Sequence, residues 1–350
     1  MDRAWRNFLN VFLAAAMGSG AILYVSVLLI DPYDIVWFSP ALDRAPVTTN
    51  QRFSFPALAR KSRFDSAVIG TSMTRLLKPS ELNETVGGGF VNLSMNSGTA
   101  YEQSRILEVF ARHHPVARTV VFGIDGTWCE RQDAPRLTPR PFPEWMYDDS
   151  RWNDLFHLFN FPAVEESGRQ FAHIAGIKTS RNGVDGYTNF LPPLSSYDVA
   201  RVRLAIYGPA GPREPKAAGD APTTENADAL RFPSHAFLDA MLRRLAPETS
   251  KILVLVPYHR FFQPAPGSNA AIALDECKRR LTVLAAGFSN SHALDFMIDS
   301  EITRRDENYW DNLHYSEEIA TQVAHLIGRG IRERRGISGA FAYLGGGPPP

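Results

Sequence analysis

A serine, an aspartate and a histidine of this chain stand at positions that suit nucleophilic chemistry. Ser72 follows Gly70-Thr71 directly after the apolar run 66–69, where a buried strand would end in a turn. Asp311 and His314 are separated by two residues in a polar stretch before the last helical segment. A carboxylate that orients an imidazole, and an imidazole that takes a proton from a hydroxyl, together activate a serine.

Each motif also has a purely structural interpretation. Ser72 could cap the N-terminus of the helix that follows it. Asp311 and His314 could be surface residues, with Ser316 as the N-cap of the last helix. Either motif alone is common, and it is their combination in one chain that favours the chemical interpretation.

Polar residues also follow two other predicted strands. Asp125 comes shortly after the apolar run 119–122, and the segment 94–99 follows the run 90–93. In an open parallel sheet the carboxyl ends of the strands meet at one edge, where ligands bind. The residues expected to lie together at this edge are Ser72, Asn96, Gly98 and Asp125.

Apolar runs and helical periods alternate along most of the chain. This alternation predicts an α/β domain with a doubly wound parallel sheet. The predicted strands are 66–69, 90–93, 119–122, 251–256 and 293–298. The predicted helices are 101–113, 234–245, 270–286 and 316–332.

Taken together, the motifs resemble those of the SGNH, or GDSL-like, esterases and acyltransferases. The family's first motif is Gly-Asp-Ser, which stands here as Gly70-Thr71-Ser72. Its last motif is Asp-x-x-His before a helix, which stands here as Asp311-Asn312-Leu313-His314. The resemblance covers residues 64–130 and 250–332, and it implies a three-layer sheet domain of the flavodoxin type.

The resemblance also implies a role for each of these residues. Ser72 would be the nucleophile, His314 the general base and Asp311 the residue that orients the imidazole. The N–H groups of Ser72 and Gly98 would bind the oxyanion, with Asn96 as a further donor. No metal and no organic cofactor would be required.

Asp125 departs from the family pattern. The family's third motif is Gly-x-Asn, whose amide donates to the oxyanion, whereas this chain has Gly123-Ile124-Asp125. An ionised carboxylate would repel an oxyanion. Asp125 could be turned away while Asn92 or Asn96 donates, it could be buried and protonated, or the oxyanion hole could be weak. We expect the first of these arrangements.

The N-terminus predicts a membrane anchor. Residues 8–30 carry no charge, and as a helix they span roughly 34 Å, enough for a bilayer core. Arg3 and Arg6 precede the run, while Asp31 and Asp34 follow it. The positive-inside rule then places the rest of the chain outside the cytoplasm. A cleaved signal peptide is the alternative, but the residues after the run offer no small-x-small cleavage site.

Composition limits the other classes of function. Lys+Arg and Asp+Glu both number 37, and this balance argues against nucleic acid as a partner. Cys129 and Cys277 have no neighbours at metal-ligand spacing, so we predict no metal site. A disulfide between them is possible outside the cytoplasm, but the sequence does not decide whether they meet.

The organisation of the chain follows from these features. We predict a cytoplasmic N-terminus at 1–7, an anchor at 8–30 and a juxtamembrane connector at 31–62. An SGNH-like domain would occupy 63–335, with an insertion at 130–230 that includes a flexible loop at 208–228. The glycine- and proline-rich tail, 336–350, is predicted to be disordered.

The substrate is inferred by analogy alone. Anchored SGNH proteins resemble polysaccharide O-acetyl transfer and teichoic-acid alanylation proteins, which implies an extracytoplasmic glycan substrate at the inner membrane and a membrane-bound O-acyltransferase as a partner. Trp128 and Trp310 are candidates for stacking on a sugar, although such aromatic residues are often core. A catalytically degenerate glycan-binding or scaffold domain and a lipid esterase are the alternatives.

Overall fold

The computed structural model describes residues 3–133, 135–180, 182–214 and 226–349. The chain divides into two compact units. The N-terminal unit consists of residues 1–57 and 142–184, and the sheet unit consists of residues 58–141 and 185–350.

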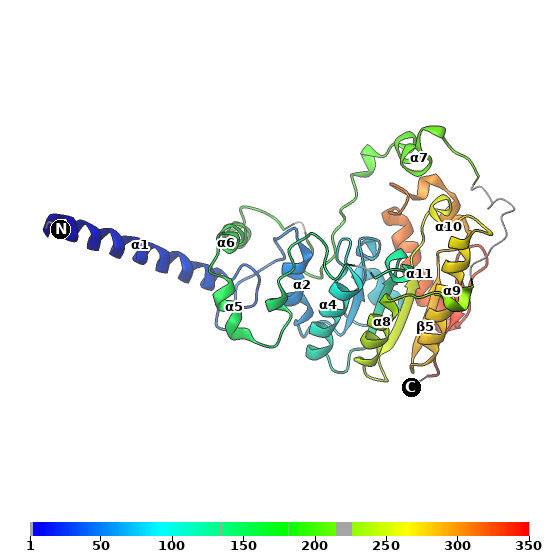
Figure 1. The fold of residues 1–350 in the computed structure, drawn as a ribbon, viewed down its shortest axis with the longest axis horizontal. Helices are drawn as coiled ribbons and strands as arrows, with labels where there is room; N and C mark the ends of the chain where they lie inside the picture. The colour runs from blue at the N-terminus through cyan, green and yellow to red at the C-terminus, as the bar shows by residue number, and fades with distance from the viewer. Residues whose placement is uncertain (1–2, 134, 181, 215–225, 350) are drawn as a thin grey trace. The chain divides into compact units, whose positions relative to one another are not determined.

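Strands and helices alternate through the sheet unit (Figure 1). The strands are β1 Ser66–Ile69, β2 Phe90–Asn92, β3 Thr119–Ile124, β4 Ser250–Leu255, β5 Ser291–Asp295 and β6 Ala342–Gly345. The helices are α1 Arg3–Ile30, α2 Gln51–Ala59, α3 Pro79–Thr85, α4 Ala100–His113, α5 Arg151–His157, α6 Phe161–Ile174, α7 Val199–Tyr207, α8 Ser234–Arg243, α9 Asn269–Ala286, α10 Glu301–Arg304 and α11 Glu317–Glu333.

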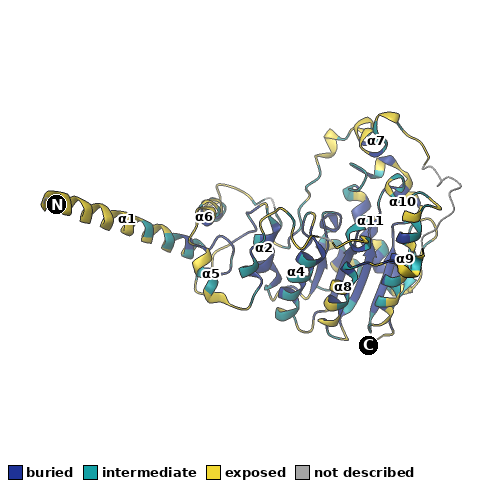
Figure 2. Cartoon of the chain, viewed as in Figure 1, coloured by how far each residue is buried: buried dark blue, intermediate teal, exposed yellow. Residues whose placement is uncertain are grey.

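In the described part of the chain, six strands form one sheet in the order β2-β1-β3-β4-β5-β6. The neighbouring strands from β2 to β5 pair in parallel, and β6 pairs antiparallel with β5. The central strands are buried along their whole length, which explains their continuous apolar runs (Figure 2). The prediction of an α/β fold with a mostly parallel sheet is confirmed.

Helices cover both faces of the sheet. Helices α3 and α11 pack against each other, and their apolar residues share one core with strand residues such as Val68, Val121 and Leu294. Helices α4 and α8 form another contacting pair. Helix α4 begins with a capping box, in which Thr99 and Glu102 satisfy each other's backbone N–H groups.

The N-terminal unit contains α1, α5, α6 and most of α2. The hydroxyl of Tyr24 on α1 donates to the carbonyl of Leu155 on α5 at 2.7 Å, and α1 contacts α6. Helix α1 is long and apolar enough to cross a membrane, and among its residues only Val27 is fully buried. A helix in the core of a globular domain would bury a whole face, so α1 is not of that kind.

Several predicted boundaries differ from the structure. The connector predicted at 31–62 contains α2, and the tail predicted to be disordered at 336–350 contains β6. The tail is held by backbone bonds, since the N–H of Asn290 donates to the carbonyl of Pro348 at 2.7 Å.

The insertion predicted at 130–230 is divided between the two units. Its residues 142–184 belong to the N-terminal unit, and the segment from residue 185 onward returns to the sheet unit. Residues 215–225 of the predicted flexible loop lie outside the described residues.

A disulfide joins Cys129 and Cys277, whose Cα atoms are 5.6 Å apart. Cys129 ends a short 3₁₀ helix, Gly126–Cys129, just after β3, and Cys277 lies on α9. The sequence left this pairing open.

Candidate functional site

Ser72, His314 and Asp311 form a hydrogen-bonded chain. His314 Nε2 lies 2.8 Å from Ser72 Oγ, and His314 Nδ1 lies 2.7 Å from Asp311 Oδ2. All three residues are partly exposed, so a ligand could reach them. The contact between Ser72 and His314 joins positions 242 residues apart in sequence. These are the distances that proton transfer from a serine hydroxyl requires.

Two glycines create the space for the turn that carries Ser72. The Thr74 hydroxyl donates to Ser94 Oγ at 2.9 Å and also lies 3.2 Å from the Thr71 carbonyl oxygen. A Cβ at Gly70 would lie 2.2 Å from Thr74 Oγ1, and a Cβ at Gly123 would lie 2.3 Å from Thr74 Cγ2. Both glycines are therefore required by the close approach of the Thr74 side chain.

Two buried tyrosines hold the loop that carries Asp311 and His314. Tyr309 and Tyr315 form an isolated antiparallel bridge, and the N–H of Trp310 donates to the carbonyl of His314 at 2.8 Å. The Tyr315 hydroxyl donates to the carbonyl of Met73 at 2.7 Å, which ties this loop to the Ser72 turn. The Tyr309 hydroxyl donates to the carbonyl of Pro257 at 3.1 Å.

Asp311 is held in its ionised form. Burial acts to raise the pKa of its carboxyl, but three hydrogen bonds outweigh that effect and lower the pKa below its ordinary value. The donors are the His314 ring, the His314 N–H at 2.7 Å and the Leu313 N–H at 2.8 Å. A carboxylate in this position orients the imidazole and stabilises an imidazolium.

The predicted oxyanion donors differ in their availability. The N–H of Ser72 donates to no acceptor in the described part of the chain. The N–H of Gly98 already donates to the carbonyl of Met95 at 3.0 Å. The Asn96 side-chain oxygen accepts from Arg75 Nη1 at 2.8 Å. Both N–H groups of Asn92 Nδ2 are occupied, by the carbonyls of Thr74 at 2.8 Å and Leu77 at 2.9 Å.

Asp125 accepts hydrogen bonds from residues other than Ser72. Its Oδ2 accepts from the Thr71 hydroxyl at 2.6 Å, and its Oδ1 accepts from the Thr127 N–H at 3.0 Å. Burial raises the pKa of this carboxyl above its ordinary value, against the effect of those bonds. Asp125 therefore supports the residue next to Ser72 and caps the 3₁₀ helix after β3.

Arg75 is a residue of this site that the sequence reasoning missed. It is 3% exposed, and its Nε has no hydrogen-bond partner among the described residues. Its guanidinium lies 5.1 Å from the centre of the Phe190 ring, and that ring meets the His314 ring edge-on at 5.5 Å. Burial lowers the pKa of Arg75 to about 10, with a contribution from Arg140. The side chain is therefore still a cation at neutral pH.

Two sequence features place Arg75 and Phe190 there. Arg75 stands three residues after Ser72, a spacing that puts two side chains on one face of a helical turn. Phe190 belongs to the segment that returns from the insertion. The N–H of Asn92 donates to the carbonyl of Asp185 at 2.8 Å, which holds this segment against β2. A Cβ at position 186 would lie 2.1 Å from the Asn92 carbonyl oxygen, so Gly186 is required there.

The two tryptophans predicted to bind a sugar occupy different environments. Trp128 is 0% exposed, so it cannot contact a substrate in this conformation, and the prediction of a binding role is wrong for it. Trp310 is half-buried and meets the Tyr197 ring edge-on at 5.0 Å. Trp310 and Tyr197 line a pocket of about 470 Å³ next to the His314 loop. Pro192, Pro193 and Leu194 also line it.

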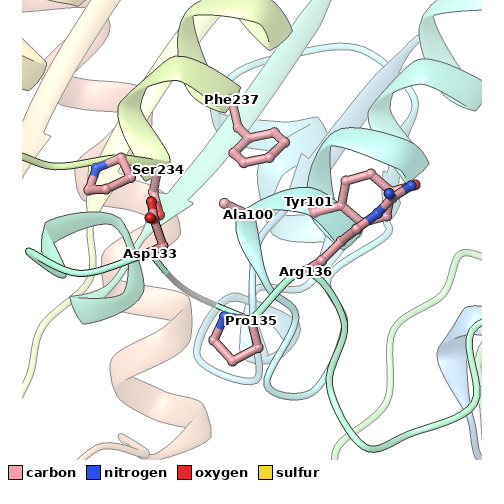
Figure 3. A pocket seen from close by; sticks show the side chains of 8 residues that line it. Ala100, Tyr101, Asp133, Pro135, Arg136, Ser234 and Phe237 are labelled. Atoms are coloured by element: carbon pink, nitrogen blue, oxygen red, sulfur yellow. The ribbon is translucent and has the colours of Figure 1, made fainter.

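Like that pocket, two further cavities in the described part of the sheet unit are lined by residues other than Ser72, Asp311 and His314. One of about 360 Å³ lies between the start of α4 and the start of α8, where Tyr101 and Phe237 face a common hollow (Figure 3). Another, of about 520 Å³, is lined by Tyr258, Phe262 and Met297 near the disulfide. Within the described residues, no group of three His, Cys, Asp or Glu side chains could hold a metal ion.

Comparison of the chain with models of known protein families and with curated proteins returns no match. The function proposed below therefore rests on the geometry of the site.

Proposed function

We propose that the protein is a serine-dependent O-acyl esterase or O-acyltransferase. The observation that carries this proposal is the chain of two short contacts from Ser72 Oγ through the His314 ring to Asp311, at 2.8 and 2.7 Å. A structural cap would need neither the imidazole nor the ionised carboxylate behind it.

The residues have defined roles in the proposed reaction. Ser72 Oγ forms a bond to the carbonyl carbon of an ester while its proton passes to His314 Nε2. Asp311 accepts from the His314 Nδ1–H and stabilises the imidazolium. The tetrahedral intermediate collapses when His314 returns the proton to the leaving alkoxide. The oxygen of water or of a sugar hydroxyl then bonds to the acyl carbon while its proton passes to His314. The bond from the acyl carbon to Ser72 Oγ breaks, and His314 returns the proton to Ser72 Oγ.

The negative charge on the oxygen of the tetrahedral intermediate must be stabilised. The Ser72 N–H supplies one donor, and the charge of Arg75, one helical turn away, favours the anion electrostatically. Arg75 would in this way take over part of the task that an Asn amide has in the family that the chain resembles. The proposal does not require Asp125 to donate.

The fold is consistent with this proposal. The strand order β2-β1-β3-β4-β5 is that of flavodoxin-type sheets, in which ligands bind between the ends of β1 and β3. Ser72 follows β1 and Asp125 follows β3. We therefore assign the sheet unit to the SGNH-like type on the basis of its motifs and strand order together.

We place the sheet unit outside the cytoplasm. The disulfide supports this location, because such bonds persist in oxidising compartments. The arginines before the apolar segment and the aspartates after it support the same orientation. By resemblance, the substrate would be an acylated extracytoplasmic glycan or another acyl donor, and a membrane-bound O-acyltransferase would be a partner.

The test uses the full-length protein in detergent. We expect it to hydrolyse 4-nitrophenyl acetate and to show, by intact mass, an acetyl adduct that maps to Ser72. Ser72→Ala should lose both signals, and Ser97→Ala, at an exposed serine, should lose neither. Equal rates for the wild type and Ser72→Ala, with no adduct on Ser72 from any activated acyl ester, would refute the proposal.

The second candidate is a glycan-binding or scaffold domain without catalysis. The observation that favours it is the short supply of oxyanion donors, because the Gly98 N–H is occupied and Asp125 only accepts. This alternative predicts that glycan binding persists in Ser72→Ala and that turnover is absent in both proteins.

A further inference from the structure

A group of large aromatic side chains is exposed on the N-terminal unit. They lie on α5, on the turn between α5 and α6, and at the start of α6. We call them the aromatic surface: Trp152, Phe156, Phe159 and Phe161, which are 70%, 82%, 71% and 78% exposed. Helix α6 buries its opposite side, with Ala163, Ser167 and Gln170 turned inward.

The aromatic surface lies against the apolar helix α1. The Tyr24 ring meets the Phe159 ring edge-on, with centroids 5.3 Å apart. The Tyr24 hydroxyl donates to the Leu155 carbonyl at 2.7 Å. At the other side of the group, Trp37 contacts Trp152 at 4.6 Å between ring centroids, and Trp37 comes shortly after the end of α1. Figure 2 shows α1 with mostly exposed residues.

The position of Tyr24 along α1 sets the depth in a bilayer at which the aromatic surface would lie. From Phe8, the first residue of the uncharged segment, to Tyr24 the helix rises about 24 Å. A bilayer core is about 30 Å thick, so Tyr24 would lie about 6 Å inside its outer boundary. Interfacial helices bury their apolar faces to depths of about 5–10 Å.

We propose that the aromatic surface inserts into the outer interface of the bilayer that α1 crosses. The ligand is the lipid itself, where acyl chains meet headgroups. Aromatic side chains concentrate at that level in membrane proteins, because their rings combine an apolar body with tolerance for a polar surrounding. The protein would then be attached to the membrane by α1, which crosses it, and by the aromatic surface, which enters one leaflet only.

The contacts with α1 favour lipid over a protein partner. Since Tyr24 is part of the segment that enters the bilayer, residues bonded to it must lie at the membrane surface. A soluble partner would have to displace lipid from the same place. This inference rests on the membrane anchor and is independent of the proposed chemistry at Ser72.

The test uses the full-length protein in phosphatidylcholine nanodiscs. Single cysteines are introduced by Phe156→Cys and Phe159→Cys and labelled with an NBD fluorophore, since the two natural cysteines are already paired. We expect blue-shifted emission, strong quenching by lipids with a doxyl group near the headgroup, and at least threefold less quenching by iodide than at the control sites. Val116→Cys and Val283→Cys, at exposed apolar residues of the sheet unit, serve as those controls.

Three results would overturn the proposal. Iodide quenching at Phe156 and Phe159 equal to that at Val116 would mean that water covers the surface. Protection from both iodide and doxyl lipid would mean that protein covers it. A Val11→Cys label on α1 that escapes doxyl lipids placed deep in the bilayer would refute the anchor itself. None of these measurements depends on esterase activity, so the proposed function is tested separately.

Discussion

Thr74 explains why glycines stand at the ends of two neighbouring strands. Its methyl and hydroxyl groups fill the places that Cβ atoms at Gly70 and Gly123 would need. Its hydroxyl bonds to Ser94 and lies close to the Thr71 carbonyl, next to Ser72. The glycines therefore affect the position of Ser72 through Thr74, a side chain outside the Gly-x-Ser motif.

Gly123→Ala is expected to lower both stability and activity. The new Cβ would lie 2.3 Å from Thr74 Cγ2, and overpacking of this kind typically costs about 1–3 kcal/mol. Thermal melting should show the loss, and hydrolysis of 4-nitrophenyl acetate should fall with it. Adding Thr74→Ser, which removes the methyl group, should restore part of the melting temperature. Gly168→Ala has open space around its Cβ and should melt no lower than the wild type.

Asp125→Asn should change the dependence of stability on pH. Because burial raises the pKa of Asp125 in the fold, the unfolded chain loses this proton at a lower pH than the folded chain does. Stability therefore falls as the pH rises from the ordinary carboxyl pKa to the raised one. Asparagine does not titrate, so the melting temperature of the variant relative to the wild type should increase between pH 4 and pH 8. If the difference in melting temperature between variant and wild type stays constant or decreases with pH, the pKa of Asp125 is not raised in the fold.

The same variant should leave turnover nearly unchanged. Both oxygens of Asp125 are bonded to Thr71 and Thr127, and neither bonds to Ser72. A large gain of activity in Asp125→Asn would mean that position 125 faces the oxyanion after all.

At the scale of elements, the loop from Tyr309 to Tyr315 is the unit that aligns the His314 ring with Ser72. Its two ends pair with each other, and each tyrosine hydroxyl reaches a different part of the sheet unit. Short loops rarely fix a side chain to within a fraction of an ångström without such anchors. The loop should therefore be sensitive to the loss of a single hydroxyl.

Tyr315→Phe is expected to reduce kcat roughly 10- to 100-fold with little change in KM. The variant loses the bond to the Met73 carbonyl, which couples the His314 loop to the Ser72 turn, and small misplacements of reacting groups are costly. Steady-state hydrolysis measures the effect. Tyr343→Phe loses a comparable contact, to His292 at 3.1 Å, and should keep wild-type kinetics. Equal kcat values for the two variants would argue against a positioning role for Tyr315.

Much of the sheet could be predicted because its strands are apolar along their whole length. The predicted bounds of β1 agree with the structure, and those of β3, β4 and β5 differ by one to three residues at an end. The rule that ligands bind at the carboxyl edge placed Ser72 and Asp125 near each other. β6 was missed because its short apolar run, Ala342–Gly345, leads directly into further glycines and prolines, so only backbone pairing with β5 reveals it.

Parts of the site could not be predicted because they depend on contacts between distant residues. The Gly98 N–H is occupied through a local turn that the motif does not show. Trp128 could be core or surface by its sequence neighbours, and burial alone decides it. Arg75 becomes part of the site only because Phe190 returns from the insertion to cover it.

At the scale of the whole molecule, the disulfide closes a loop that contains the whole of the predicted insertion, 130–230. Cys129 and Cys277 are 148 residues apart in sequence. Crosslinks across long loops stabilise mainly by restricting the unfolded chain. The bond also holds α9 to the segment after β3.

Replacing both cysteines by serine should lower the free energy of unfolding by about 2–5 kcal/mol. Denaturant titration of the full-length protein, with and without reductant, measures the loss. Reductant should destabilise the wild type by a similar amount and leave the double variant unchanged. A double variant as stable as the oxidised wild type would show that the bond has no structural role.

The N-terminal unit has a consequence for how the protein could be shed from a membrane. It is assembled from residues 1–57 and 142–184, so the chain crosses between units at three places. A protease that cuts near residue 57 leaves the two pieces packed, since Ser180 and Asn182 both bond to the Pro46 carbonyl. Cuts near residues 141 and 184 leave the sheet unit in one covalent piece, because the disulfide spans them. One nick is therefore not enough for release into solution: either the N-terminal unit must come apart after the cut near residue 57, or all three crossings must be cut.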